Sequence, residues 1–144
     1  MTAPLTVGDV MTRGPWVVDD DAPLRQARSR MVEHEVHHLP VVRRGALVGV
    51  LSDRDVKRAL DPDLGLPPKE ELFVRDVCVF DAYTVPPSEP LEEVLRMMAT
   101  RHIGSALVTD EGHVLGIFTA SDACRIFADF LRTAGRPSAN AHSS

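Results

Sequence analysis

Apolar residues in the first half of the chain change their spacing in a regular order. A short strand-like run at 16–18 precedes apolar residues spaced as on one face of a helix, and this pattern predicts a helix that ends near His34. Two dense apolar runs at 39–42 and 46–51, separated by a tight turn, predict adjacent strands, and a second helix begins near Asp53. Dense short runs are typical of strands that helices cover, so we predict the order β-α-β-β-α.

The second half repeats the pattern of the first without a gap. Val74 corresponds to Val7, an offset of 67 positions that also aligns Asp122 with Asp55. Repetition at a fixed offset indicates two copies of one structural unit. We therefore divide the chain into repeat 1 (7–60), a linker rich in helix breakers (61–73), repeat 2 with an extended C-terminal helix (74–131), and a tail that we expect to be disordered (132–144).

The size of one repeat indicates how the two are arranged. A unit of about 54 residues is too small to bury a stable core by itself. Two copies that pack their sheets against each other would share one core. We therefore predict an α+β fold in which the repeats pack sheet to sheet as one module with pseudo-twofold symmetry.

Composition and charge exclude several classes of protein. The chain has 144 residues, 44% of them hydrophobic and 26% charged, with a formal net charge of −5. This is typical of a globular domain, and it lacks the basic surplus of a nucleic-acid-binding protein. We find neither a long apolar stretch for a membrane nor a signal-peptide core, and we interpret Cys78 and Cys124 as buried free thiols. We therefore expect a cytoplasmic protein.

One motif ends the second long apolar run of each repeat: a glycine, two apolar residues, a hydroxyl, two variable residues and an aspartate. The two copies are Gly49, Ser52 and Asp55 in repeat 1, and Gly116, Thr119 and Asp122 in repeat 2. The pattern approximates a capping box, in which hydroxyl and acid stabilise a helix N-terminus. It also suits a ligand, because a carboxylate at this place can accept from two ribose hydroxyls and glycine would let the ligand approach the backbone. The residues alone leave both interpretations open.

The two repeats together resemble a tandem pair of CBS domains, the cystathionine β-synthase modules that pair as a Bateman module. The resemblance covers about 7–127 and rests on the element order, the opening at 9–12, the strand at 39–42 and the two motifs above. It implies that an adenosine-containing ligand, such as AMP, ADP, ATP or S-adenosylmethionine, binds in clefts between the repeats. In that family the hydroxyl and the acid hold the ribose, a role that the resemblance assigns to Ser52, Asp55, Thr119 and Asp122.

The resemblance further implies an adenine slot, and phosphates would require cations at its mouth. The slot residues would be Met11, Thr12, Val18 and Pro40 in repeat 1, and Val79, Val85 and Leu107 in repeat 2. The candidate cations are His37, His38 and Arg54 in repeat 1, and Arg101 and His102 in repeat 2. The mouth of repeat 2 is less basic, so we expect the two sites to be used unequally.

The stretch His34-Glu35-Val36-His37-His38 matches the zinc-protease pattern H-E-x-x-H. That chemistry requires both outer histidines on one helical face, a third ligand and Glu35 as general base. The helix would have to continue almost to Pro40, and no third ligand is recognisable on a downstream helix. A metal-binding or zinc hydrolase site therefore remains only a remote alternative.

From these observations we predict a regulatory ligand-binding module and not an enzyme, without catalytic residues, catalytic cofactor or metal. We also expect a symmetric homodimer, because the last helix of repeat 2 carries a broad apolar stripe that includes Phe127 and Phe130. CBS pairs commonly dimerise through their helices, which supports this expectation. An unknown regulated protein would receive the signal, whereas nucleic acid and membrane are not expected as partners. The alternative is a ligand-free dimerisation scaffold.

Overall fold

The computed structural model describes residues 4–61 and 71–135. The first half contains α1 (Val7–Val10), β1 (Thr12–Arg13), β2 (Val18–Asp19), α2 (Leu24–His34), β3 (His38–Arg43), β4 (Ala46–Ser52) and α3 (Asp53–Leu60). The second half contains η2 (Val74–Asp76), β5 (Thr84–Val85), α4 (Leu91–Arg101), β6 (Ser105–Asp110), β7 (His113–Thr119) and α5 (Ala120–Ala134). The predicted order β-α-β-β-α is confirmed in both halves, from β2 to α3 and from β5 to α5.

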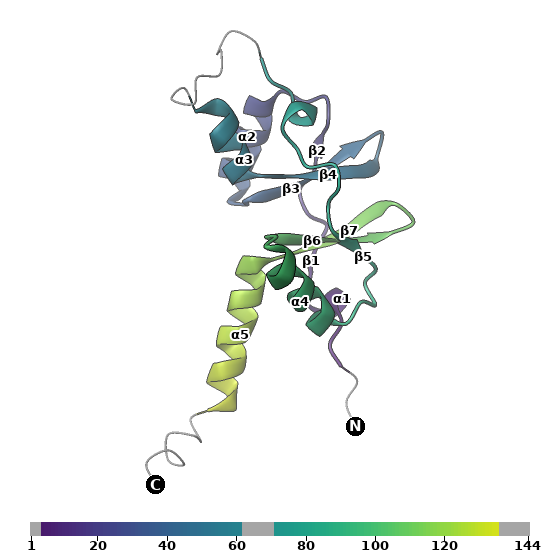
Figure 1. Ribbon diagram of the computed structural model, residues 1–144, viewed down its shortest axis with the longest axis vertical. Coiled ribbons are helices and arrows are strands. Elements are labelled where there is room, and N and C mark those ends of the chain that lie inside the picture. The colour runs from purple at the N-terminus through teal and green to yellow at the C-terminus, as the bar shows by residue number, and fades with distance from the viewer. Residues whose placement is uncertain (1–3, 62–70, 136–144) are drawn as a thin grey trace.

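Two sheets face each other across the middle of the molecule, and the helices lie on their outer sides (Figure 1). The first sheet has the order β2-β3-β4, with β2 parallel and β4 antiparallel to β3. The second sheet has the order β1-β7-β6-β5. In it β5 is parallel and β7 antiparallel to β6, and β1 is antiparallel to β7. The α+β class and the pseudo-twofold packing of the two repeats are therefore confirmed.

Each half is completed by a segment from the other repeat. Val7 and Met11, which begin repeat 1, lie in the hydrophobic core of the second half, and β1 pairs with β7 at the edge of the second sheet. Val74 and Cys78, which begin repeat 2, lie in the core of the first half. Val79 then pairs with Val50 of β4. The N-terminal segments of the two repeats are thus exchanged, and the two halves are tied together where their sheets meet.

The C-terminal helix differs most between the repeats. Whereas α3 ends at Leu60, α5 continues to Ala134 and extends away from the body of the molecule (Figure 1). The expectation of two buried thiols is half wrong, because Cys78 is buried but Cys124 is exposed on this helix. Most of the expected linker, at 62–70, and most of the expected tail, at 136–144, lie outside the described residues. No helix within 4–61 and 71–135 is long and apolar enough to cross a membrane.

Candidate functional site

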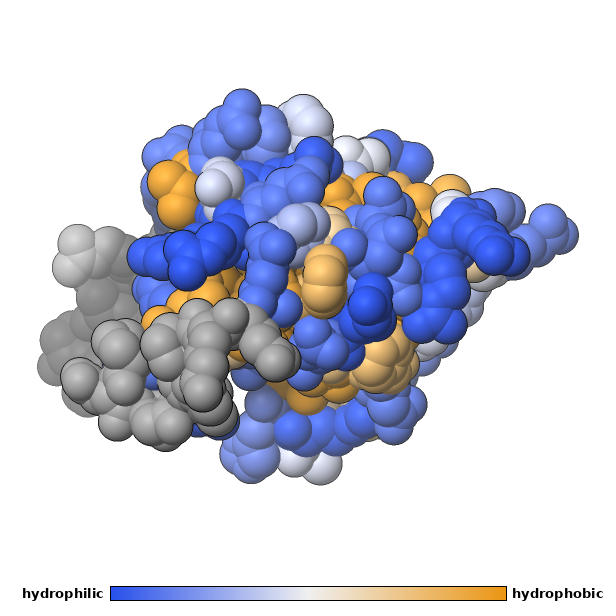
Figure 2. All heavy atoms as spheres, turned by 90° about the horizontal axis from the view of Figure 1, so that it is seen from above, coloured by the Kyte–Doolittle hydropathy of each residue, from blue (hydrophilic) through white to orange (hydrophobic). Residues whose placement is uncertain are grey.

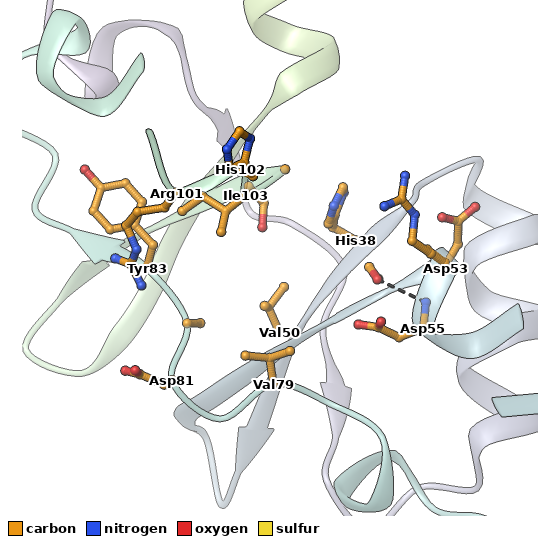
Figure 3. A pocket seen from close by; sticks show the side chains of 15 residues that line it. His38, Val50, Asp53, Asp55, Val79, Asp81, Tyr83, Arg101, His102 and Ile103 are labelled. Carbon is orange, nitrogen blue, oxygen red and sulfur yellow. Dashed lines mark hydrogen bonds between the residues drawn. The ribbon is translucent and has the colours of Figure 1, made fainter. Parts of the chain in front are cut away.

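A cleft of about 510 Å³ lies between the two halves of the molecule (Figure 3). Three segments of the chain form most of it: the turn from β4 into α3, the segment 79–83 that precedes β5, and the segment 101–105 that joins α4 to β6. His38, at the start of β3, completes the lining. Asp55 lies on one side of the cleft and Tyr83 on the other, with Val50 and Val79 between them (Figure 3). A ligand in this cleft would contact both repeats.

The turn from β4 into α3, which we call the β4–α3 corner (residues 49–55), supplies the polar side of the cleft. Ser52 is the N-cap of α3, and its Oγ accepts a hydrogen bond from the Asp55 N–H at 3.2 Å. Within the described part of the chain, the Asp55 carboxylate makes no hydrogen bond or ion pair with another side chain. A partly exposed carboxylate beside a hydroxyl can accept hydrogen bonds from the two hydroxyls of a ribose.

The apolar floor of the cleft depends on a crossing of two chain segments. Val50 donates its N–H to the Val79 carbonyl at 3.0 Å, and Val79 donates to the Val50 carbonyl at 2.9 Å. Gly49 allows this crossing, because a Cβ there would overlap the Val79 carbonyl oxygen. In repeat 2 a Cβ on Gly116 would lie 2.5 Å from Met11 Sδ. Both glycines therefore accommodate another part of the same chain, and the ligand contact expected at them stays a prediction.

Tyr83 and Arg101 form the opposite wall of the cleft. The Arg101 guanidinium lies 5.7 Å from the centre of the Tyr83 ring, a distance at which a cation interacts with an aromatic face. Burial raises the pKa of the Tyr83 hydroxyl, and the Glu89 charge raises it further, so the hydroxyl stays protonated near neutral pH. Asp81 lies on the same side of the cleft (Figure 3). This wall thus offers a flat ring, one cation and one anion.

His38 lies between the two walls and is half-buried (Figure 3). A Cβ on Gly104 of the second half would lie 3.1 Å from His38 Nε2, so the absence of a side chain at Gly104 makes room for the ring. Burial lowers the pKa of His38, and the nearby carboxylates of Asp53 and Asp55 only partly oppose this effect. His38 is therefore neutral at pH 7, which does not favour the expected role as a phosphate-binding cation.

His37 is oriented differently from His38. Its side chain is 70% exposed, and its Nδ1 lies 2.9 Å from Asp53 Oδ2. Partial burial would raise the pKa of Asp53, but the hydrogen bond and charge of His37, together with the charge of Lys57, outweigh burial and lower it. Asp53 is consequently ionised at neutral pH, and His37 serves as its partner beside the cleft.

The β7–α5 corner (residues 116–122) is equivalent to the β4–α3 corner but is closed by internal hydrogen bonds. Asp122 Oδ2 accepts from the Thr119 N–H at 2.9 Å and from the Thr119 hydroxyl at 3.0 Å. Arg125 Nη1 donates to Asp122 Oδ1 at 3.0 Å. Asp122 is only 7% exposed. This arrangement is a full capping box, and it lies outside the lining of the cleft described above.

The structure brings only part of the expected site together. The residues that line the cleft as predicted are His38, Ser52, Arg54, Asp55, Val79, Arg101 and His102. The expected adenine-slot residues that are instead buried in the cores or sheets are Met11, Val18, Pro40, Val85 and Leu107. The others outside this lining are Thr12, Gly49, Gly116, Thr119 and Asp122.

Eight further lining residues were not identified from the sequence. They are Val50, Asp53, Asp81, Ala82, Tyr83, Ile103, Gly104 and Ser105. One signal could have identified Tyr83: it is the repeat counterpart of Trp16, and both are aromatic residues within two positions of the start of a short strand. Trp16 in turn stacks on His34, with the two ring centres 3.6 Å apart. An aromatic ring therefore occupies the equivalent place in each repeat.

The H-E-x-x-H stretch does not form the continuous helix that the zinc-protease pattern requires. Helix α2 ends at His34, and Glu35 follows in the left-handed conformation with a φ of 54°. His34 and His38 therefore do not share a helical face, and their rings have different neighbours. Among residues 4–61 and 71–135, no three His, Cys, Asp or Glu side chains are placed to hold a metal ion. The helical face on which the zinc hydrolase alternative depends is therefore not present in this stretch.

Comparison with known proteins supports the same architecture. The chain is 33% identical over 120 residues to homoserine O-acetyltransferase from Methanocorpusculum labreanum, which covers 81% of this chain and 23% of the relative. It spans about a quarter of the length of the first curated relatives that it matches. Among solved structures, AcuB from Vibrio cholerae superposes with a TM-score of 0.82 at 28% identity, over 92% of this chain and 98% of AcuB.

A second solved structure contains a ligand. CBSX2 in complex with AMP superposes with a TM-score of 0.76 at 30% identity, over 88% of this chain and 98% of CBSX2. The sequence model of the CBS domain matches this chain twice, at residues 7–62 and 74–129. Pairs of CBS domains are regulatory ligand-binding modules. The chain belongs to the CBS domain family, and its two repeats form a CBS domain pair.

Proposed function

We propose that this CBS pair binds an adenosine-containing ligand in the cleft beside Ser52 and Asp55, and that it signals the level of this ligand. The observation that carries the proposal is the Asp55 carboxylate, which is partly exposed at the cleft and makes no ion pair with another described residue. Its neighbour Ser52 adds a hydroxyl, and Val50 and Val79 add an apolar surface for a base. The AMP complex of CBSX2 supports the same ligand class.

The signal would arise because the ligand contacts both repeats at once. Ser52 and Asp55 belong to repeat 1, whereas Tyr83 and Arg101 belong to repeat 2. A ligand that contacts both sides stabilises the arrangement in which the two walls are correctly spaced. The size of the shift is limited by the difference in ligand affinity between the two arrangements. Changes in the relative position of the repeats would then be passed to a partner protein.

Thermal unfolding with a series of adenosine compounds tests the proposal. Adenosine, 5′-methylthioadenosine, S-adenosylmethionine, AMP and ATP form the series, and guanosine serves as the control nucleoside. At a concentration of about 100 times Kd, one site adds about 2.7 kcal/mol to the unfolding free energy. For a chain of this size the midpoint should rise by roughly 5–10 °C. If no adenosine compound at millimolar concentration raises the midpoint, the alternative of a ligand-free scaffold is favoured.

We also propose that two copies of the chain associate through α5. Phe127 and Phe130 are 60% and 62% exposed, and their rings stack with centres 6.3 Å apart. Together with the exposed Leu131 they form an apolar surface on the helix that extends from the body. By contrast, the outer face of the first half is mainly hydrophilic, with hydrophobic areas separated by polar ones (Figure 2). A self-complementary helix surface of this kind favours a symmetric dimer.

Sedimentation of single variants tests the dimer. Phe127→Glu and Phe130→Glu should convert the dimer to a monomer at tens of micromolar protein, because a buried unpaired carboxylate opposes association. Val32→Glu is the matched control, since Val32 is 73% exposed on α2 of the other half. A wild-type monomer would contradict the dimer. A dimer that persists in both phenylalanine variants would exclude this surface as its interface.

A further inference from the structure

Carboxylates outnumber arginines in the lining of the cleft. Asp53, Asp55 and Asp81 line it together with only two arginines, Arg54 and Arg101. Asp53 and Asp55 lie on the first turn of α3, and Asp81 lies on the opposite side of the cleft, the side that Arg101 also occupies (Figure 3). The three carboxylates therefore border the cleft from both walls. A cleft built for several phosphates would need the opposite balance of charge.

The cations that surround the cleft do not reverse this balance. His38 is neutral at pH 7 because burial lowers its pKa. Lys57 lies outside the lining, and its Nζ is 3.6 Å from Asp53, so it balances a carboxylate that is already present. The N-terminus of α3 also has little remaining positive potential, because Asp53 and Asp55 occupy its first turn. With three carboxylates against two arginines, the lining has no surplus of permanent positive charge.

Asp81 and Arg101 together give the wall of repeat 2 a mixed character. They share one side of the cleft, where the Arg101 guanidinium lies over the Tyr83 ring. A group that carries both charges, or none, can lie beside this pair without leaving either charge unbalanced. A chain of phosphates would satisfy Arg101 but would bring further negative charge close to Asp81 and, across the cleft, to Asp55. Repulsion of this kind is strongest where water is partly excluded.

We infer that the cleft prefers nucleosides whose tail is neutral, zwitterionic or cationic, such as thioether or sulfonium nucleosides, over nucleoside polyphosphates. This inference rests on the function proposed above, because it concerns the tail of a ligand whose ribose lies at Ser52 and Asp55. It names Asp81 as a specificity-determining residue. Asp55 has a separate task, since it contacts the part that all adenosine compounds share.

Calorimetric titration with a series of tails tests the inference. Adenosine, 5′-methylthioadenosine, S-adenosylmethionine, AMP and ATP are compared without divalent cations, at about 150 mM and about 20 mM salt. ATP should bind at least about tenfold more weakly than adenosine. This gap in affinity between ATP and adenosine should widen at low salt, where repulsion is less screened. Asp81→Asn should narrow the gap. Asp110→Asn is the control, because Asp110 is exposed at the far end of β6 and changes the net charge equally.

Each outcome separates this inference from the proposed function. If ATP binds as tightly as adenosine or more tightly, the inference is overturned and adenosine binding stands. If Asp81→Asn and Asp110→Asn change the gap equally, the overall charge of the protein and not the cleft determines the preference, which also overturns it. If no compound in the series binds at all, the proposed function fails and the inference fails with it. Asp81 is exposed, so the variant is expected to fold.

Discussion

The β4–α3 corner and the β7–α5 corner share the same spacing of glycine, hydroxyl and carboxylate, but their carboxylates have different neighbours. Asp122 accepts hydrogen bonds from Thr119 and pairs with Arg125, and it is almost completely buried. Asp55 is partly exposed beside a cleft and forms no such capping box. Arg58 occupies the position equivalent to Arg125, so the difference does not come from the absence of an arginine in repeat 1.

The comparison shows that one motif can serve two purposes within one chain. In repeat 2 the hydroxyl and the acid stabilise the first turn of α5, and little of the carboxylate is left for a ligand. In repeat 1 the hydroxyl caps α3, and the acid remains available. Capping and ligand binding are therefore not competing explanations of the motif, because each can apply to a different copy.

The largest expected difference between the two corners concerns their glycines. Gly49→Ala should lower the unfolding free energy by about 3 kcal/mol, because the added Cβ meets the Val79 carbonyl, which is held by hydrogen bonds to Val50. Gly116→Ala should cost less, about 2 kcal/mol, because Met11 Sδ can move away from the added Cβ but the Thr12 carbonyl oxygen, at 2.8 Å, is held in the backbone. Urea unfolding measures both. Gly104→Ala is the control, because the flexible His38 side chain faces it. Equal costs for Gly49 and Gly116 would contradict the prediction.

The second largest expected difference between the corners is the contribution of Asp55 and Asp122 to ligand affinity. Asp55→Asn keeps the size of the side chain but removes its charge, and a hydrogen bond to a charged group contributes about 1.5–3 kcal/mol. Affinity for adenosine should therefore fall by about 10–100-fold, with the unfolding free energy changed by less than about 0.5 kcal/mol. Calorimetry measures the affinity, and Asp122→Asn is the control, which should bind normally. Full-strength binding by Asp55→Asn would remove this residue from the site.

For the unfolding free energy we expect the opposite result: Asp122→Asn should have the larger effect and Asp55→Asn the smaller one. Asp122→Asn should lose about 1 kcal/mol of unfolding free energy, because it weakens the capping box of α5 and the ion pair with Arg125. Here Asp55→Asn is the control and should remain close to wild type. Denaturant unfolding without ligand gives both values. A greater loss for Asp55→Asn would show that the first corner is the stronger cap.

The smallest expected effect is the dependence of stability on pH at His38, whose counterpart in repeat 2 is Ser105. Burial lowers the pKa of His38 in the folded state, so the unfolded chain binds the proton more readily. The stability contributed by the neutral ring is therefore present above about pH 6.5 and is lost as the pH falls below it. We expect a loss below about 1 kcal/mol between pH 7.5 and pH 5.5. Unfolding of His38→Gln at both pH values should show a smaller loss than wild type; an equal loss would assign the effect elsewhere.

Local patterns predicted the order of the elements well. Helices α2 and α4 end at His34 and Arg101 in the same register, because the spacing of apolar residues depends only on near neighbours. The exchange of segments could not be predicted in this way. The pairing of Thr12 with Ile117 joins distant parts of the chain, and a strand of two residues has no periodicity to detect.

The site was predictable only where a motif marked it. Ser52 and Asp55 were identified because hydroxyl and acid stand at a fixed distance from a glycine. Val18 and Leu107 are buried, and their expected place beside adenine stays a prediction, because an apolar residue in a strand suits a core as well as a ligand. Tyr83 was missed because it lies on a connecting segment, and only the folded chain brings it opposite Asp55.

The exchanged segments also determine when each half can form during synthesis on the ribosome. The core of the first half includes Val74 and Cys78, so it stays incomplete until these residues have left the exit tunnel. The core of the second half needs Val7 and Met11, which are made first and must wait for almost the whole chain. Chains normally fold from the N-terminal domain onward as it emerges. Here neither repeat is such a unit, so truncation after Leu60 should yield an aggregation-prone fragment and not half of the module.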